Sequence, residues 1–395
     1  MNTIGLVGLA HGTSHFFQLA LPPLFPWIGA GLALNHTQLG VLLTVFYVVS
    51  CAGQALAGFV VDRVGARLVL FGGVACIALA ALGLAISPNY STLLLFMMLG
   101  GIGNCVFHPV DFSIMNQRVS TARLGQAYAV HGISGNLGWT LAPVFVVGLT
   151  QASGSWRVAM AGTAVLIAVV LVMLYLGRPS IACAAPRLDR PHGDPHGSLG
   201  FLRLPAVWYC FGFFLVFAFA LGGIQSFAPA AAGQLHGVAA AQVAICLSSY
   251  MAASAVGMVL GGQLLRDPQR SARIAAIGFG FAAVLALMIG LGSWPGWMIP
   301  VLFATMGVGA GLAGPARDLL VKQATPEGAT GRVYGIVYSG LDVGMALAAL
   351  VFGTMMDGGQ YRLVWLLVAL AQASLVITAF SVKRRWRPGS LAAAR

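Results

Sequence analysis

The chain has 395 residues, of which 59% are hydrophobic and only 8% are charged. Soluble globular domains carry about 25% charged residues, so this composition excludes a water-facing surface over most of the molecule. A net charge of +12 in a soluble protein would suggest a nucleic-acid partner. The basic residues lie at the ends of apolar segments, where they indicate membrane topology. We therefore expect no nucleic-acid partner.

Twelve apolar segments, each long enough to cross a bilayer, follow one another along the chain. The first six are 4–31, 37–60, 67–87, 91–116, 125–149 and 156–177. The last six are 204–231, 238–264, 272–292, 297–321, 331–354 and 362–382. They are apolar on every side and do not alternate in polarity, which favours helices over a barrel. The sequence therefore predicts an all-α membrane protein with twelve transmembrane helices.

The basic residues indicate how these helices are oriented. With the N-terminus in the cytoplasm, all 21 Lys and Arg residues except Arg157 and Arg362 fall on the cytoplasmic side. The positive-inside rule therefore predicts a multi-pass protein of a bacterial-type inner membrane with both termini in the cytoplasm. The excess of basic residues is thus explained by membrane topology, and the net charge gives little information about the substrate.

Composition also divides the chain into parts. We expect an N-terminal six-helix bundle at 1–178, a cytoplasmic linker at 179–203, a C-terminal six-helix bundle at 204–388 and a tail at 389–395. The linker is rich in Pro, Gly and His, as mobile connections are. His192 and His196 in the linker have a spacing that a metal would tolerate, although a solvated linker is the favoured interpretation.

An internal repeat relates the two bundles. Gly101 and Gly103 correspond to Gly307 and Gly309, and the same offset of 206 residues connects further pairs. These pairs are Pro109 with Pro315, Gly125 with Gly331, Tyr128 with Tyr334, and Gly138 with Gly344. A constant offset predicts two homologous six-helix halves, the parallel repeat of major facilitator permeases.

The loop between the second and third spans carries a motif. It contains Gly58, Asp62, Arg63, Gly65 and Arg67 in the order G-x-x-x-D-R-x-G-x-R, which resembles the loop signature of the major facilitator superfamily. Asp62 can accept hydrogen bonds from a nearby helix N-terminus, and the glycines allow close helix contact and a tight turn. We expect a cytoplasmic gate here; a basic loop that only sets topology is the alternative.

The first span has a polar stripe. His11, His15 and Gln18 share one helical face, which should line an internal cavity, and the prolines that follow (Pro22, Pro23 and Pro26) should break or bend the outer part of the span. We expect His11, His15 and Gln18 to contact substrate and His15 to assist proton coupling. Hydrogen bonding between helices is the alternative.

The fourth span contains His108, Pro109 and Asp111. Pro109 should kink the helix. Ionisable groups inside a membrane are costly and usually functional, so His108 and Asp111 are candidates for proton coupling. The alternatives are a histidine that satisfies backbone groups freed by the kink and an ion pair between Asp111 and Arg118.

Asp342 in the eleventh span is the principal proton-coupling candidate. It lies near the predicted membrane midplane with no basic residue in its own span, and its repeat partner is Asn136. A midplane carboxylate indicates a functional site; an ion pair with Arg317 is the alternative. Further substrate-binding candidates, each with local hydrogen bonding as the alternative, are His131, Asn136, Gln225, Tyr250 and Tyr338.

The N-terminal half resembles the fosmidomycin-resistance branch of the major facilitator superfamily. The similarity lies in His11 to Pro26, in the Phe-His-Pro element ending at Pro109, and in the stretch from Gly125 to Pro143. The last stretch also loosely resembles the glycine-rich fifth span of drug/proton antiporters. The resemblance implies a secondary transporter, often a proton-driven exporter. His15 stands where such relatives tend to have an acidic residue, which suits an anionic substrate.

We therefore expect a transporter that moves a small organic, anionic or drug-like solute by alternating access, with proton-coupled export. Proton-coupled uptake of a small organic acid is the alternative, and a membrane receptor or membrane enzyme is a remote one. No Walker loop, clustered nucleophile and base or catalytic metal set is present, and the cysteines have no metal-ligand spacing, so we expect no enzyme, cofactor or metal. The expected partners are the solute, protons and the lipid bilayer, and the chain should be a monomer.

Overall fold

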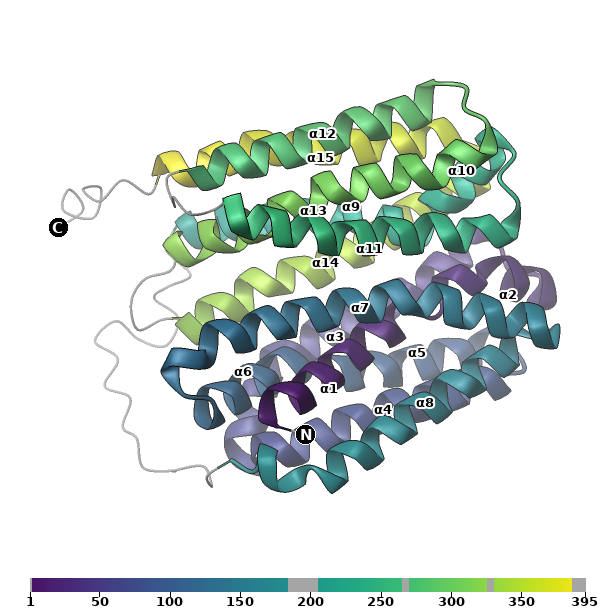
Figure 1. Ribbon diagram of the computed structural model, residues 1–395. Coiled ribbons are helices and arrows are strands. Elements are labelled where there is room, and N and C mark those ends of the chain that lie inside the picture. Colours follow the sequence, from purple (N-terminus) through teal and green to yellow (C-terminus); the bar gives the residue numbers. More distant parts are fainter. Residues whose placement is uncertain (1, 184–204, 265–269, 325–329, 386–395) are drawn as a thin grey trace.

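The computed structural model describes residues 2–183, 205–264, 270–324 and 330–385. Within these ranges the chain forms α-helices and short 3-10 turns and contains no strand. The helices lie in two neighbouring bundles, one from each half of the sequence (Figure 1). Most of the predicted linker (184–203) and the predicted tail (389–395) lie outside the described residues.

The N-terminal bundle begins with a helix that prolines interrupt. Its helices are α1 (Thr3–Gln18), α2 (Phe25–Leu32), α3 (His36–Val64), α4 (Ala66–Ile86), α5 (Tyr90–Asn104), α6 (Phe107–Arg118), α7 (Thr121–Ser153) and α8 (Trp156–Leu176). A 3-10 turn at Pro22–Leu24 separates α1 from α2. Prolines lack the N–H that continues a helix, so the predicted break of the first span is confirmed.

The C-terminal bundle has a matching set of long helices. They are α9 (Pro205–Ser226), α10 (Ala228–His236), α11 (Ala240–Leu264), α12 (Ser271–Leu291), α13 (Ile299–Ala324), α14 (Thr330–Asp357) and α15 (Tyr361–Arg385). Pro229 lies in the first turn of the short α10, where a missing N–H costs nothing. The predicted seventh span is thus divided between α9 and α10, as the first is divided between α1 and α2.

The fourth predicted span is also interrupted. Helix α5 ends at Asn104 and α6 begins at Phe107, so the turn lies at Cys105 and Val106. Pro109 cannot bond to the carbonyl of Cys105 four residues earlier, and its ring would clash with that carbonyl in a regular helix. The predicted kink is therefore confirmed, and it takes the form of a break.

Eleven helical segments of the described chain are long and apolar enough to cross a membrane. The interrupted first span accounts for the difference from the twelve that the sequence predicts. Apolar side chains on the outer surface, such as Leu176 and Val165, are 74% and 64% exposed. Such a surface is stable against lipid but not against water, which supports the membrane location.

The repeated glycines make equivalent contacts in the two bundles. A Cβ at Gly101 would lie 2.5 Å from the carbonyl oxygen of Phe46 in α3, and one at Gly307 would collide with the carbonyl of Tyr250 in α11. Likewise, a Cβ at Gly138 would collide with the carbonyl of Gly12 in α1, and one at Gly344 with the carbonyl of Leu215 in α9. The predicted repeat is therefore confirmed at the level of helix packing.

Two ends of the molecule are distinguished below. The terminus end is where α1 begins and α15 ends (left in Figure 1), and the far end is where α3 begins and α14 ends. Helices α3 and α14 pack against each other across the boundary between the bundles, as do α7 and α11. These two pairs place the candidates Asn136, Tyr338 and Asp342 at the boundary between the bundles.

Candidate functional site

Five ionisable side chains from three helices meet inside the N-terminal bundle. They are His11 and His15 of α1, His108 and Asp111 of α6, and His131 of α7, and we call them the histidine cluster. Asp111 is fully buried, and His11 and His131 are 3% and 7% exposed. His131 Nε2 forms a 3.0 Å hydrogen bond with Asp111 Oδ2, and His11 Nδ1 lies 3.2 Å from the same oxygen. The sequence predicted all five, and the structure brings them together.

Aromatic rings of this cluster pack closely, and two of its imidazoles stack face to face. The His11 and His131 ring centroids are 3.5 Å apart at an interplanar angle of 22°, and the His15 ring lies 4.2 Å from the Trp139 ring. Gly135 makes room for them, because a Cβ there would lie 2.7 Å from His15 Nδ1 and 3.1 Å from His11 Nε2. The glycines of α7 therefore allow the cluster to pack.

The alternative pairing of Asp111 with Arg118 is wrong. Arg118 donates to the carbonyl oxygen of Pro179 at 3.3 Å, near the terminus end, while the described partners of Asp111 are histidines. Seven residues, about two helical turns, separate Asp111 from Arg118 along α6. The carboxylate points into the bundle and the guanidinium points to its end.

A chain of hydrogen bonds leads from α7 to Asp342 in the other bundle. Trp139 Nε1 donates to Gln18 Oε1 at 3.2 Å, and Gln18 Nε2 donates to Asn104 Oδ1 at 2.9 Å. Asn104 Nδ2 donates to Ser50 Oγ at 2.9 Å, and Ser50 Oγ donates to Asp342 Oδ2 at 3.2 Å. We call these five residues the polar ladder.

The indole of Trp139 sets the direction of the whole ladder. It has a donor and no acceptor, so Gln18 must turn its oxygen to Trp139 and its nitrogen to Asn104. Asn104 must then accept with its oxygen from Gln18 and donate with its nitrogen to Ser50. The hydroxyl proton of Ser50 is left to donate to Asp342. The ladder therefore ends on an acceptor, which a carboxylate provides.

Asp342 lies near the middle of α14 and is half-buried. Its hydrogen bond with Ser50 of α3 crosses the boundary between the bundles. The side chain of Arg317, the predicted alternative partner, lies outside the described part of the structure. Asn136, the repeat partner of Asp342, also crosses the boundary, because its Nδ2 lies 3.1 Å from the sulfur of Met258 in α11.

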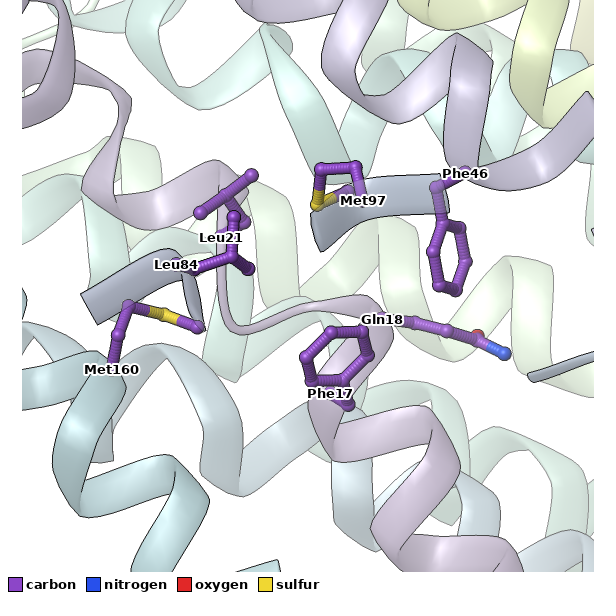
Figure 2. A pocket seen from close by; sticks show the side chains of 7 residues that line it. All are labelled: Phe17, Gln18, Leu21, Phe46, Leu84, Met97 and Met160. Carbon is purple, nitrogen blue, oxygen red and sulfur yellow. The ribbon is translucent and has the colours of Figure 1, made fainter. Parts of the chain in front are cut away.

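The space around Gln18 is tightly filled. Figure 2 shows a small pocket lined by Phe17, Gln18, Leu21, Phe46, Leu84, Met97 and Met160. It has no room for a water molecule, and the Gln18 amide points away from Met160 and Leu84 (Figure 2). Gln18 therefore serves the ladder in this conformation and leaves no solute-sized space beside it.

At the far end, one carboxylate joins the two bundles. Asp357, the last residue of α14, accepts hydrogen bonds from the backbone N–H groups of His36 and Thr37 at 2.8 Å each. The ring Nδ1 of His36 lies 2.9 Å from the same carboxylate. An anion at a helix N-terminus is favourable, so Asp357 caps α3 from the other bundle. We call Asp357, His36 and Thr37 the far-end latch.

Among the described residues, the hydrogen bonds that connect one bundle to the other lie at the far end or near the middle of the molecule. Thr44 donates to the carbonyl of Ala346 at 3.0 Å, and Ser248 donates to the carbonyl of Thr140 at 2.9 Å. Toward the terminus end, a Cβ at Gly58 of α3 would have no heavy atom within 4 Å. This conformation is therefore closed at the far end.

The predicted gating loop lies at the terminus end, between α3 and α4. Gly65 has φ +91°, which confirms the predicted tight turn, since other residues rarely adopt this conformation. The close helix contact expected at Gly58 is not found among the described residues, because a Cβ there would have no heavy atom within 4 Å. Arg63 is exposed and Arg67 is half-buried, and the side chain of Asp62 lies outside the described part.

The remaining substrate-binding candidates are not gathered in one place. The Tyr338 ring of α14 lies 5.7 Å from the His108 ring across the boundary. Gln225 and Tyr250 are buried in the C-terminal bundle, where Gln225 Nε2 lies 3.9 Å from Met251 Sδ. Neither of these two is among the described ring or polar contacts of the histidine cluster.

Several residues of the site were missed by the sequence analysis. Ser50, Asn104 and Trp139 complete the ladder, and His36 and Asp357 form the latch. A polar residue within an apolar span was a usable signal for Asn104. The latch residues lie at span ends, where polar residues are ordinary, so they carried no such signal.

Comparison with known proteins identifies the family. The model of the Major Facilitator Superfamily matches residues 7–349, which is most of the chain. The chain belongs to the major facilitator superfamily. It is therefore a multi-pass membrane transporter of the solute or drug efflux or uptake kind, and its helices have the all-α arrangement expected of this superfamily.

Curated proteins that the chain resembles have names that describe different activities. The fosmidomycin resistance protein of Escherichia coli (strain K12) is 26% identical over 95% of this chain and 92% of that protein. The probable nitrate/nitrite transporter NarK2 of Mycobacterium tuberculosis is 24% identical over 91% of each chain. The uncharacterized MFS-type transporter YfnC of Bacillus subtilis (strain 168) is 28% identical, over 44% of this chain and less than half of that relative, 43%.

A solved structure has the same fold. A bacterial homologue of the human lysosomal transporter Spinster, in an inward-facing and occupied conformation, superimposes with a TM-score of 0.71 at 17% identity. The alignment covers 98% of both chains. The arrangement of all helices is therefore that of a major facilitator transporter, although at this identity the match concerns the fold alone.

Proposed function

We propose that this protein is a secondary active transporter that exports a small organic, anionic or drug-like solute in exchange for protons, by alternating access. The observation that carries the proposal is the hydrogen bond between Ser50 and Asp342 across the bundle boundary. Separation of the bundles removes this bond, so the charge state of Asp342 and the position of the bundles influence each other. Such mutual influence is what coupling requires.

The orientation is part of the same proposal. We place the protein in a bacterial-type inner membrane with the terminus end in the cytoplasm, supported by the positive-inside distribution of its basic residues. The far end then faces outward, and the conformation described above is closed on that side. In the opposite conformation the Asp62 loop would lock the terminus end, where Gly58 now faces open space.

The solute site is proposed at the bundle boundary, where the predicted contacts Asn136 and Tyr338 face the other bundle. Export is supported by the glycine-rich α7 and by the names of the fosmidomycin and multidrug resistance relatives. The proton-coupling roles of His15, His108 and Asp111 remain predictions, and the proposal does not depend on them.

Proton movement in proteoliposomes tests the proposal. The vesicles hold a trapped pH dye, and fosmidomycin, nitrate and small organic anions are added outside, one at a time. Solute entering by exchange removes protons from the lumen and raises its pH, whereas symport lowers it. We expect a rise with at least one compound, its loss in Asp342→Asn, and its retention in Thr354→Ala, an exposed residue of the same helix whose hydroxyl bonds within α14.

Three outcomes would change the proposal. An equal signal in Asp342→Asn would remove Asp342 from the coupling path. A fall in luminal pH would replace export by proton-coupled uptake, the alternative that the same carboxylate serves. Solute flux measured with a radiolabel but without any pH change would replace coupled transport by facilitated diffusion.

A further inference from the structure

The histidine cluster contains an unusual concentration of unsatisfied atoms. Six buried side-chain nitrogen or oxygen atoms of the described residues have no hydrogen-bond partner. Three of the six belong to this cluster: His15 Nδ1, Asp111 Oδ1 and His11 Nδ1, the last of which lies 3.2 Å from Asp111 Oδ2 without forming a hydrogen bond to it. Buried polar groups are normally satisfied, so three orphans in one place indicate that the cluster is built for a ligand that supplies positive charge or donors.

The charge of Asp111 points to the same conclusion. A carboxylate with no exposed surface inside a membrane bundle needs a cation close by. Both described ion-pair partners of Asp111 are histidines, His11 and His131. Its second oxygen, Oδ1, accepts nothing. One hydrogen bond from His131 therefore leaves half of the carboxylate without compensation.

The ligand atoms have the spacing of a metal site. Asp111 Oδ2 lies 3.2 Å from His11 Nδ1 and 3.0 Å from His131 Nε2, and all three atoms lie within 4.8 Å of one another. Two atoms bound about 2.0–2.1 Å from a tetrahedral zinc ion are roughly 3.3 Å apart. Because the His11 and His131 rings are now stacked, the two rings would rotate apart to bind an ion between these atoms.

We propose that His11, Asp111 and His131 form a binding site for a divalent first-row transition-metal ion of the zinc or cobalt type. Two imidazoles and one carboxylate are a ligand set that such ions favour. His15 and His108 form a second group of three with His11 within the same 4.8 Å limit and lie beside the proposed site. The ion would connect α1, α6 and α7, and it would take the place of the hydrogen bond between His131 and Asp111.

This site goes beyond the proposed transport function, which rests on Asp342. The sequence predicted no metal, because the ligands come from three helices and have no local spacing that a motif would show. The two functions are testable separately, since metal binding requires neither a solute nor a proton gradient.

The test is a Co²⁺ titration of the tag-free protein in detergent, followed by visible absorption and by counting bound ions after dialysis. The background variant carries His36→Gln, His192→Gln, His196→Gln and His236→Gln, so that the cluster holds its only histidines. We expect one Co²⁺ per chain in this background, displaced by Zn²⁺. Adding His131→Gln or Asp111→Asn should weaken binding more than about tenfold.

The background variant retains all five residues of the histidine cluster. Its Co²⁺ binding therefore tests the proposal even if a variant within the cluster fails to fold. No bound Co²⁺ in that background would overturn the proposal and leave the cluster as a proton or solute site. Equal affinity with and without His131→Gln, in protein that elutes as the same species on gel filtration, would also overturn it.

Discussion

Asn104 shows how a single buried amide connects the parts of the site. It follows the glycine-rich end of α5, at the break before α6, and uses both ends of its side chain in the ladder. It is only 8% exposed, so water cannot replace a lost partner. Removing the amide would leave the Gln18 nitrogen without its acceptor and the Ser50 oxygen without its donor.

We expect Asn104→Leu to destabilise the protein by about 1–3 kcal/mol, the cost of leaving buried polar groups unsatisfied. Ser50→Ala should cost a similar amount, about 1–3 kcal/mol, because the fully buried hydroxyl bonds to both Asn104 and Asp342 and its loss leaves the Asn104 amide nitrogen without an acceptor. Thermal unfolding in detergent, followed by circular dichroism, measures both. Ser374→Ala is the control, since its hydroxyl bonds only within α15 in the described structure.

Equal melting temperatures for Asn104→Leu and Ser374→Ala would show that the ladder contributes nothing to stability. A larger loss in Ser50→Ala than in Asn104→Leu would mean that the inter-bundle bond, rather than the buried amide, dominates. Either result would change the description of the ladder as a continuous unit.

At the scale of single residues, the sequence predicted one residue of many interacting pairs but not the residue that it contacts. His11, Asp111 and His131 could be named because ionisable residues within apolar spans are rare. Their common meeting point could not, since it depends on how α1, α6 and α7 pack. Ser50 was not found, because serine is frequent in membrane helices and only its position opposite Asp342 gives it a role.

Among the helices, the closest approaches occur where glycines of the repeat meet backbone. Gly138 of α7 lies against the carbonyl of Gly12 in α1, and Gly344 makes the equivalent contact with Leu215. Gly132, six residues earlier in α7, has open space where a Cβ would be. Helix α7 therefore contains one glycine that is in close contact with another helix and one glycine that is not.

We expect Gly138→Ala to destabilise the N-terminal bundle by about 1–3 kcal/mol through overpacking, because the new methyl group meets backbone that cannot rotate away. Gly132→Ala should leave the stability unchanged or raise it slightly, since alanine is the better helix former. Thermal unfolding of the two variants under identical conditions checks this. A melting temperature for Gly138→Ala at or above that of Gly132→Ala would contradict the packing described.

The sequence predicted the helices more completely than it predicted the contacts of single residues. The spans, the proline break in the first span and the kink near Pro109 were all predictable, because hydropathy and proline chemistry are local. The division of the seventh span between α9 and α10 was missed. Pro315 lies inside a continuous α13, whereas its repeat partner Pro109 follows a break, so packing decides how a proline is accommodated.

For the molecule as a whole, the two bundles are closed at the far end, where the latch joins the start of α3 to the end of α14. The family and the two-bundle arrangement could be predicted from composition, motifs and the repeat. The latch could not, since 321 residues separate His36 from Asp357 and neither stands out in its own segment. Only the folded chain shows that the end of α14 caps the start of α3.

The latch predicts how the conformational balance can be shifted. Asp357→Asn keeps the size of the side chain but removes the charge that favours the N-terminus of α3. We expect a cost of about 1 kcal/mol to the far-end-closed state, because the carboxylate is 26% exposed and its bonds are partly screened. The population should move toward a conformation that is open at the far end and closed at the terminus end.

Spin-label distances measured at both ends of the molecule test alternating access most directly. One pair, Ala30→Cys with Gln360→Cys, reports on the far end, and another, Gln117→Cys with Leu264→Cys, reports on the terminus end, each with the six native cysteines replaced by alanine. We predict that Asp357→Asn lengthens the far-end distance and shortens the terminus-end distance, while Thr354→Ala changes neither. Distances that stay constant at both ends, or that lengthen together, would contradict two bundles that rock around a central site.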